Sequence, residues 1–163
     1  MGMSVTISAA AEQDAEQIFR LQYLCFQSEA ALYGNYRIDP LVQTLDSVRE
    51  EVARDCVFVA RLGDEIVGSV HGRITEDGAA AIGKLCVHPR LQGHGIGARL
   101  LKAAESALAG ERGARTFRLH AGHRSESSLY SKVGYQRVGT SRGADGVPMI
   151  VLEKNAETYA TTA

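Results

Sequence analysis

Three glycines alternate along the chain at Gly93, Gly95 and Gly97, and they are suited to binding an anion. Glycine lacks a Cβ atom, so a ligand can approach the backbone of such a segment closely. From Ile96 to Leu108, apolar residues then recur with the spacing of one helix face. Free N–H groups of the turn would therefore meet the positive end of a helix dipole. This combination suits a phosphate or pyrophosphate group.

A short apolar strand is predicted immediately before the glycines. Leu85, Cys86 and Val87 form an apolar run that ends at His88 and Pro89. Proline cannot donate to a sheet ladder, and it biases the residue before it towards an extended backbone. The strand should therefore end here, which gives a predicted unit of strand, glycine-rich turn and amphipathic helix.

Two nucleotide-binding motifs contain glycines at comparable spacing. A P-loop requires lysine and then serine or threonine after its last glycine, but Gly97 is followed by alanine and arginine, which excludes it. The dinucleotide motif G-x-G-x-x-G/A is matched by Gly93, Gly95 and Ala98. It should be followed by a strand that ends in an acidic residue for the ribose, and Thr116–His120 does not. A nucleotide-binding module therefore stays the weaker alternative.

The segment resembles the pyrophosphate loop of the GNAT superfamily of acetyl-CoA-dependent N-acetyltransferases. That loop has the pattern Q/R-x-x-G-x-G/A, and Gln92, Gly95 and Gly97 match each defined position. The V-x-P that precedes it in the family is matched by Val87-His88-Pro89. A second family block, Y-x-x-x-G-F/Y, is matched by Tyr130–Tyr135. The two blocks stand in the family's order and at about its usual separation.

The resemblance implies roles for individual residues. The amides of the glycine turn would hold the coenzyme pyrophosphate, and the strand before it would pair with the pantetheine arm. The residues implied for the coenzyme are Leu85, Cys86, Val87, Gln92, Gly93, His94, Gly95, Ile96, Gly97 and Ala98. Tyr130 matches the family tyrosine whose hydroxyl can protonate the departing thiolate. Glu29, Tyr33 and Tyr36 lie in or beside an aromatic segment that would cover the amine acceptor, and no metal is implied.

The sequence departs from the family pattern in two places. Many members carry a glutamate as general base on the strand before the turn, but Ala79–Val87 contains no carboxylate. The asparagine often found seven residues before the tyrosine is His123 here. The identity of the base is thus open, and His120 and His123, near the end of the strand after the main helix, are candidates.

Composition limits the class of protein. The 163 residues suffice for one domain, predicted over 1–155 with a disordered tail at 156–163. The net charge of −1 argues against nucleic acid as the main partner. Cys25, Cys56 and Cys86 are odd in number and far apart, so neither a disulfide framework nor a zinc site is indicated. With no long apolar span and no leader in the sequence, we expect a cytoplasmic protein that does not bind membranes.

Periodicity and the resemblance together predict the fold. Apolar runs indicate strands at Ser4–Ile7, Cys56–Ala60, Ile66–His71, Ala79–Val87, Thr116–His120, Tyr135–Thr140 and Val147–Glu153. Helices are predicted at about 11–28, from Pro40 to Val52 with Asp39 as N-cap, from Ile96 to Gly110 or Gly113, and through Val133 with Ser125 as cap, with a loop at 32–38. The order resembles the α/β GNAT acyl-CoA N-acyltransferase fold, with a mixed central sheet of about seven strands and about four helices. The nearly continuous apolar run of the second strand would fit a sheet covered on both faces.

The expected activity is transfer of the acetyl group of acetyl-CoA to a primary amine. The amine, on a small molecule or a peptide, would attack the thioester directly, without an acyl-enzyme. A non-catalytic acyl-CoA sensor is the alternative from another class. The resemblance also implies that the protein can form a homodimer.

Overall fold

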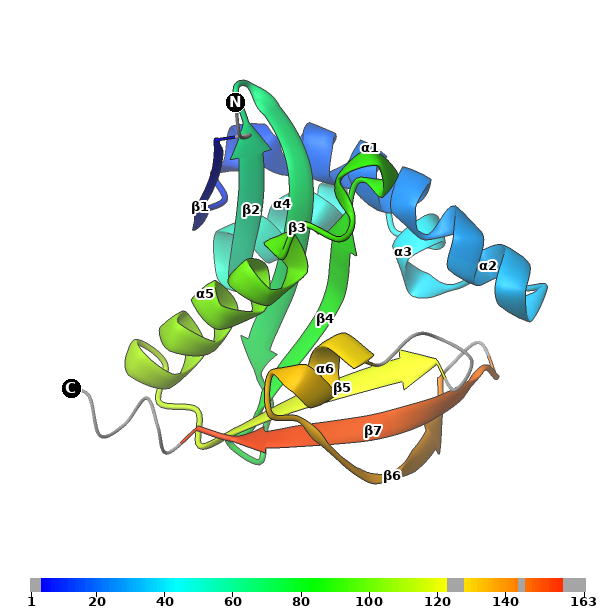
Figure 1. The fold of residues 1–163 in the computed structure, drawn as a ribbon, viewed down its shortest axis with the longest axis vertical. Coiled ribbons are helices and arrows are strands. Elements are labelled where there is room, and N and C mark those ends of the chain that lie inside the picture. The colour runs from blue at the N-terminus through cyan, green and yellow to red at the C-terminus, as the bar shows by residue number, and fades with distance from the viewer. Residues whose placement is uncertain (1–3, 123–127, 144–145, 157–163) are drawn as a thin grey trace.

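A seven-stranded sheet runs through the molecule (Figure 1). The computed structural model of the protein describes residues 4–122, 128–143 and 146–156. The strands are β1 (Val5–Ala9), β2 (Cys56–Leu62), β3 (Glu65–Ile74), β4 (Ala80–Val87), β5 (Thr116–Gly122), β6 (Gln136–Arg142) and β7 (Pro148–Asn155). The helices are α1 (Ala15–Cys25), α2 (Gln27–Tyr33), α3 (Asp39–Val42), α4 (Leu45–Arg54), α5 (Ile96–Gly110) and α6 (Ser128–Lys132), with 3₁₀ turns at Glu12–Asp14 and Pro89–Leu91. The predicted seven-stranded α/β architecture is confirmed.

The sheet changes direction between β4 and β5. Across the sheet the strand order is β1-β2-β3-β4-β5-β7-β6, and only β4 and β5 are parallel neighbours. A parallel pair needs a crossover connection, which α5 supplies. The pairing covers only Ala80–Ile82 on β4 and Phe117–Leu119 on β5. Beyond Ile82 the two strands part, and Figure 1 shows them running in clearly different directions.

Helices cover both faces of the first half of the sheet. α5 lies across one face, in front of β2 and β3 in Figure 1, and buries Leu100 and Leu108 there. α1 and α4 cover the opposite face, where Ile18 and Val48 pack in one cluster with Val59 of β2. Side chains of β2 enter both clusters in alternation, which explains why this strand is apolar along nearly its whole length.

The first predicted helix is divided, and the predicted loop after it is shorter than expected. α1 ends at Cys25, and Phe26 has a non-helical backbone (φ −89°, ψ 3°) before α2 begins. α2 then continues to Tyr33, through the first residues of the segment predicted as loop. It ends at Gly34, which takes a left-handed conformation (φ 62°) that glycine adopts without strain. The prediction of a loop from residue 32 was therefore wrong by two residues.

The second predicted helix is also divided. Asp39 and Pro40 begin only the four-residue α3, and the N-cap of α3 is Ile38, so the prediction of Asp39 as the N-cap was wrong. Gln43 is extended (φ −61°, ψ 138°). α4 then starts from Thr44, whose hydroxyl accepts a hydrogen bond from the Ser47 N–H at 3.1 Å. The apolar spacing alone does not show this break, because it continues in phase across it.

The described part of the chain extends one residue past the predicted domain end. Ala156 is buried, and its N–H donates to the carbonyl of Arg115 at 2.9 Å. The rest of the predicted tail and Ser125, the predicted cap of the short helix, lie outside the described residues. In the part of the chain that the structure describes, no helix combines the length and the apolar character needed to cross a membrane.

Candidate active site

Two cavities open where β4 and β5 part, and they meet at a common wall. The first, which we call the glycine-turn groove, has a volume of about 690 Å³. Its lining residues are Cys25, Phe26, Leu85, Cys86, Val87, Leu91, Gln92, Gly93, Gly95, Ile96, Gly97, Ala98, Leu129, Tyr130 and Lys132. The second, the α2-side cavity, has a volume of about 520 Å³ and is lined by residues of α2, α3, α6 and the strands β4 to β7. Phe26, Leu85 and Tyr130 line both.

The glycine turn is an open cradle of backbone. Gly93 and Gly95 have positive φ angles of 84° and 77°, and a Cβ atom built on either would have nothing within 4 Å. The open space beside them belongs to the glycine-turn groove, where α5 begins. The side chain of Gln92 donates to the carbonyl of Val87 at 3.3 Å and so ties the turn to the end of β4. Backbone N–H groups at a helix start suit a pyrophosphate, so the cradle fits that group.

The structure brings together most of the residues predicted for the coenzyme. Nine of the ten line the glycine-turn groove. The exception is His94, whose side chain is exposed and does not belong to the lining. Sequence reasoning missed Cys25, Phe26, Leu91, Leu129 and Lys132. Cys25 ends α1, Phe26 lies between α1 and α2, and Leu129 and Lys132 lie on α6, so only the tertiary fold brings these residues beside the turn.

Tyr130 lies at the junction of the two cavities. It stands on α6, and its ring packs edge-on against Tyr135, with the ring centroids 6.2 Å apart. Burial, with a smaller contribution from the carboxylate of Glu29, raises the pKa of Tyr130 to about 12. The phenol therefore stays protonated at neutral pH and can donate a hydrogen bond into the junction.

The predicted acceptor residues separate into two groups. Glu29 and Tyr33, both on α2, line the α2-side cavity. Tyr33 packs so closely on β5 that a Cβ at Gly122 would overlap its hydroxyl, which explains the glycine there. Tyr36 is 56% exposed and is not part of the lining.

The opposite wall of the α2-side cavity comes from the second half of the sheet. It includes His120 of β5 and Ser141, Arg142 and Met149 of β6 and β7. His120 Nδ1 lies 3.1 Å from Ser141 Oγ. Burial and the nearby Arg118 lower the pKa of His120, so its imidazole is neutral at pH 7. His123, the second histidine considered from the sequence, lies outside the described residues.

Two cysteines lie beside the groove on the α1 side. Cys86 is buried, with Ser69 Oγ 3.5 Å from its sulfur, and Cys25 Sγ lies 3.5 Å from the carbonyl oxygen of Val87. Hydrogen bonding to Cys86, together with burial, raises the pKa of Cys25. Cys25 therefore remains a thiol at neutral pH.

Comparisons with known proteins agree with this geometry. Residues 53–137 of the 163 match the family profile described as Acetyltransferase (GNAT) domain. The chain therefore belongs to the GNAT acetyltransferase family. A search of curated protein sequences finds no significant relative.

Solved structures show the same fold at low sequence identity. One is PaiA N-acetyltransferase from Thermoplasma acidophilum in complex with coenzyme A (TM-score 0.78, 19% identity, 94% of this chain and 99% of that chain). Another is aminoglycoside 6'-acetyltransferase type Ii (TM-score 0.72, 24% identity, 93% and 97%). A third is a Vibrio cholerae spermidine N-acetyltransferase chimera (TM-score 0.70, 17% identity, 96% and 98%).

The glycine cradle can be tested by filling it. Gly95→Val should lower the affinity for coenzyme A at least about tenfold, or about 1.4 kcal/mol, because its side chain would occupy the open space. The substitution also strains the positive φ, so Gly78→Val is the matched control. Gly78 has a φ of 83°, has equally open surroundings and lies outside both cavity linings. Calorimetry on folded proteins should show full affinity for Gly78→Val, and unchanged affinity for Gly95→Val would contradict the site.

Proposed function

We propose that the protein transfers the acetyl group of acetyl-CoA to the nitrogen of a primary amine. The observation that carries this proposal is the meeting of the glycine-turn groove and the α2-side cavity at Leu85 and Tyr130. A thioester at the end of the first cavity would face an amine in the second. Membership of the GNAT family supports an acyl transfer, and two of the similar structures are named for amine substrates.

The residues of the glycine-turn groove fit the coenzyme. The backbone of Gly93 and Gly95 is accessible to a pyrophosphate, and Lys132 contributes a positive charge to the same groove. Leu85 and Val87 continue the lining towards the junction as an apolar wall for the pantetheine arm. When bound, acetyl-CoA supplies the acetyl group as a thioester.

The chemistry at the junction can be assigned to residues of both cavities. The amine nitrogen bonds to the acetyl carbon, the carbon–sulfur bond breaks, and coenzyme A leaves as the thiolate. Tyr130 donates a hydrogen bond to the sulfur as its negative charge develops. Glu29 and Tyr33 orient the amine from the α2 side.

The amine must lose a proton before it attacks. An alkylammonium with a pKa of about 10.4 requires roughly 4–5 kcal/mol to deprotonate at pH 7. His120 faces the same cavity with a neutral imidazole, and Ser141 holds one of its ring nitrogens. We assign His120 as the proton acceptor on this basis.

A panel assay tests the proposal. The protein is incubated with acetyl-CoA and a set of amines (amino acids, polyamines, aminoglycosides and peptides with free N-termini), and release of free thiol is followed. We expect thiol release that depends on one class of amine. Tight coenzyme A binding with no thiol release above background for any amine would favour the non-catalytic sensor instead.

The role of the α2 side can be tested separately. Tyr33→Ala should raise the KM for the amine about fivefold or more and leave the KM for acetyl-CoA within about twofold, because Tyr33 lines only the α2-side cavity. Tyr36→Ala removes a tyrosine that is exposed, and we expect a smaller change. The assignment of Tyr33 fails if its variant changes only the KM for acetyl-CoA.

A further inference from the structure

Lys84 has an unusual backbone conformation. Among the described residues it is the only non-glycine residue with a positive φ, at 52°. A Cβ atom makes this left-handed region unfavourable for a lysine. Such conformations persist when the surrounding structure determines them, and they are concentrated at functional sites.

The residue lies in a bulge at the point where the sheet opens. Ser69 of β3 pairs with Cys86 and His71 with Gly83, so two residues of β4, Lys84 and Leu85, face a single residue of β3. The pairing of β4 with β5 ends two residues before Lys84. The segment 83–85 lines the α2-side cavity, and Leu85 also lines the glycine-turn groove. The bulge therefore forms the wall at which the two cavities meet.

The side chain of Lys84 is anchored on α4. Its Nζ lies 2.7 Å and 2.9 Å from the two carboxylate oxygens of Glu51, and it donates to the side-chain oxygen of Gln43 at 3.0 Å. Only 18% of the lysine side chain and 16% of the glutamate side chain are exposed. The anchor is thus a shielded ion pair, unlike the exposed pairs on the surface of the protein.

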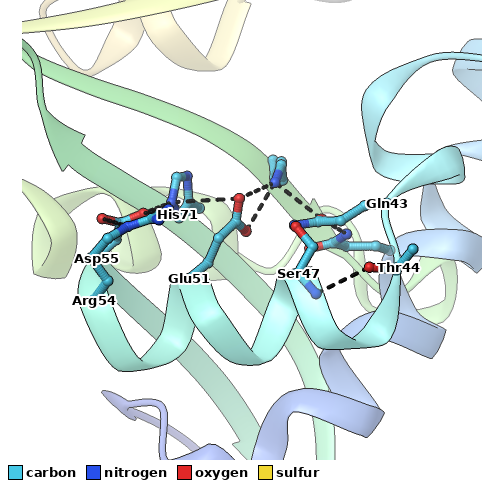
Figure 2. A network of polar contacts seen from close by, with 9 residues as sticks. Gln43, Thr44, Ser47, Glu51, Arg54, Asp55 and His71 are labelled. Carbon is cyan, nitrogen blue, oxygen red and sulfur yellow. Dashed lines mark hydrogen bonds and ion pairs between the residues drawn. The ribbon is translucent and has the colours of Figure 1, made fainter.

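Further polar groups hold the anchor in place. Figure 2 shows Gln43, Ser47, Glu51 and Asp55 in a row along α4 and the residues at its two ends. On one side, His71 Nε2 lies 2.8 Å from Asp55 and 3.9 Å from Glu51. On the other side, Gln43 donates to Ser47 at 3.2 Å. Burial alone would raise the pKa of Glu51, but hydrogen bonds from Lys84 and Gln43 outweigh this effect, and the net shift is downward. The carboxylate is therefore ionised at neutral pH.

We propose that the Lys84–Glu51 ion pair is a positioning device for acetyl transfer, which holds the β4 bulge in the shape that sets the thioester against the amine. This inference rests on the proposed function. Without the anchor, the unfavourable φ of Lys84 favours relaxation of the bulge towards regular strand pairing. Removing the extra residue shifts the register by one, and a shift by one turns side chains to the opposite face. If the segment before the bulge takes up this shift, towards the turn at 75–79, the residues from Cys86 onward and the glycine turn keep their places. The backbone of Lys84 and Leu85, at the wall between the cavities, would then change shape.

Two substitutions at Lys84 separate the anchor from the backbone shape. Lys84→Met keeps an unbranched stem and removes the charge, so the bulge should relax. We expect kcat with the best amine of the panel to fall at least about tenfold, with coenzyme A affinity changed less than about threefold. Lys84→Gly also removes the anchor, but glycine adopts the positive φ without strain. Its kcat should therefore exceed that of Lys84→Met by at least about threefold.

Hydrogen exchange gives a readout that does not depend on turnover. The amides of residues 83–87 should exchange faster in Lys84→Met than in the wild type, and less so in Lys84→Gly. If Lys84→Met does not fold, Glu51→Gln weakens the same pair from α4 and should give the same pattern.

The outcomes distinguish this inference from the proposed function. A wild-type protein that releases no thiol with any amine refutes the function, and unchanged exchange at 83–87 then refutes the positioning role by itself. Wild-type turnover together with wild-type kcat in Lys84→Met overturns the inference alone. Equal losses in the Met and Gly variants would also overturn it, because a general loss of stability predicts no rescue by glycine.

Discussion

Replacing Tyr130 with phenylalanine is expected to lower kcat about 10²-fold and to change acetyl-CoA affinity less than about threefold. Tyr130 lines both cavities at their junction, where the sulfur of the leaving group would develop its charge. The ring itself, which packs on Tyr135, is retained in the variant. The loss should therefore appear in the chemical step.

The pKa of Tyr130 decides how the hydroxyl acts. A phenol with a pKa of about 12 is a weaker acid than a thiol, whose pKa is about 8.5. Complete proton transfer to the thiolate would be uphill by roughly 3.5 pKa units, or about 5 kcal/mol. Donation of a hydrogen bond avoids this penalty. Removal of one such donor to a developing negative charge typically lowers kcat about 10²–10³-fold, which agrees with the expected loss.

The same pKa predicts the pH dependence. An ordinary tyrosine would lose its proton near pH 10 and would produce an alkaline fall in kcat. Because Tyr130 keeps its proton until about pH 12, the wild type should show no fall from this group at lower pH. Tyr130→Phe should then lower kcat by the same factor throughout the range from about pH 7 to pH 10.

Tyr23 provides the control for this experiment. It is 56% exposed on α1 and lines neither cavity, so Tyr23→Phe should retain wild-type kcat. Steady-state kinetics across the pH range measures both variants. A Tyr130→Phe protein with wild-type kcat would assign the tyrosine a packing role only.

Features that are formed by one short continuous segment can be predicted well from the sequence. The strand, the glycine turn and the start of α5 lie within residues 80–110, so local patterns and the family blocks identify nine lining residues of one cavity. The α2-side cavity is different. Tyr33, His120 and Met149 meet there from distant parts of the chain, and no spacing rule connects them.

The bulge at Lys84 shows why other parts of the site could not be predicted from the sequence. A charged residue inside an apolar strand indicates that something must compensate the charge. Its partners Glu51 and Gln43 lie more than thirty residues earlier, and Gln43 lies at the break between α3 and α4 that the apolar periodicity hides. The bulge, the break and the ion pair depend on one another, so each requires the folded structure to be seen.

A second buried ion pair fixes α5 to the other half of the sheet, and its disruption should have the largest effect on stability. Glu105 of α5 is only 1% exposed. Its carboxylate accepts a hydrogen bond from the Tyr135 hydroxyl at 2.7 Å and lies 2.9 Å from the Nζ of Lys154 on β7. The contact joins the helix that begins at the glycine turn to the strands that form the far wall of the α2-side cavity.

Lys154→Met should lower the free energy of unfolding by about 3 kcal/mol. Removing one member of a buried pair leaves the opposite charge uncompensated and typically costs about 3–5 kcal/mol. The value should fall at the lower end, because Tyr135 still donates to the carboxylate. Lys102→Met is the matched control. Lys102 is exposed on α5, the helix that carries Glu105. We expect its substitution to change the free energy of unfolding by less than about 0.5 kcal/mol.

Urea unfolding of these two variants, of Glu105→Gln and of the double variant Glu105→Gln/Lys154→Met measures this directly. If the uncompensated charge is the cause, neutralising Glu105 in the Lys154→Met background should recover part of the loss, with a coupling energy of about 1 kcal/mol or more. Coenzyme A affinity of the folded Lys154→Met protein should stay near that of the wild type, because Lys154 lies outside both cavity linings. Stability within 1 kcal/mol of the wild type would show that the packing of α5 on the sheet, and not this ion pair, holds the two halves together.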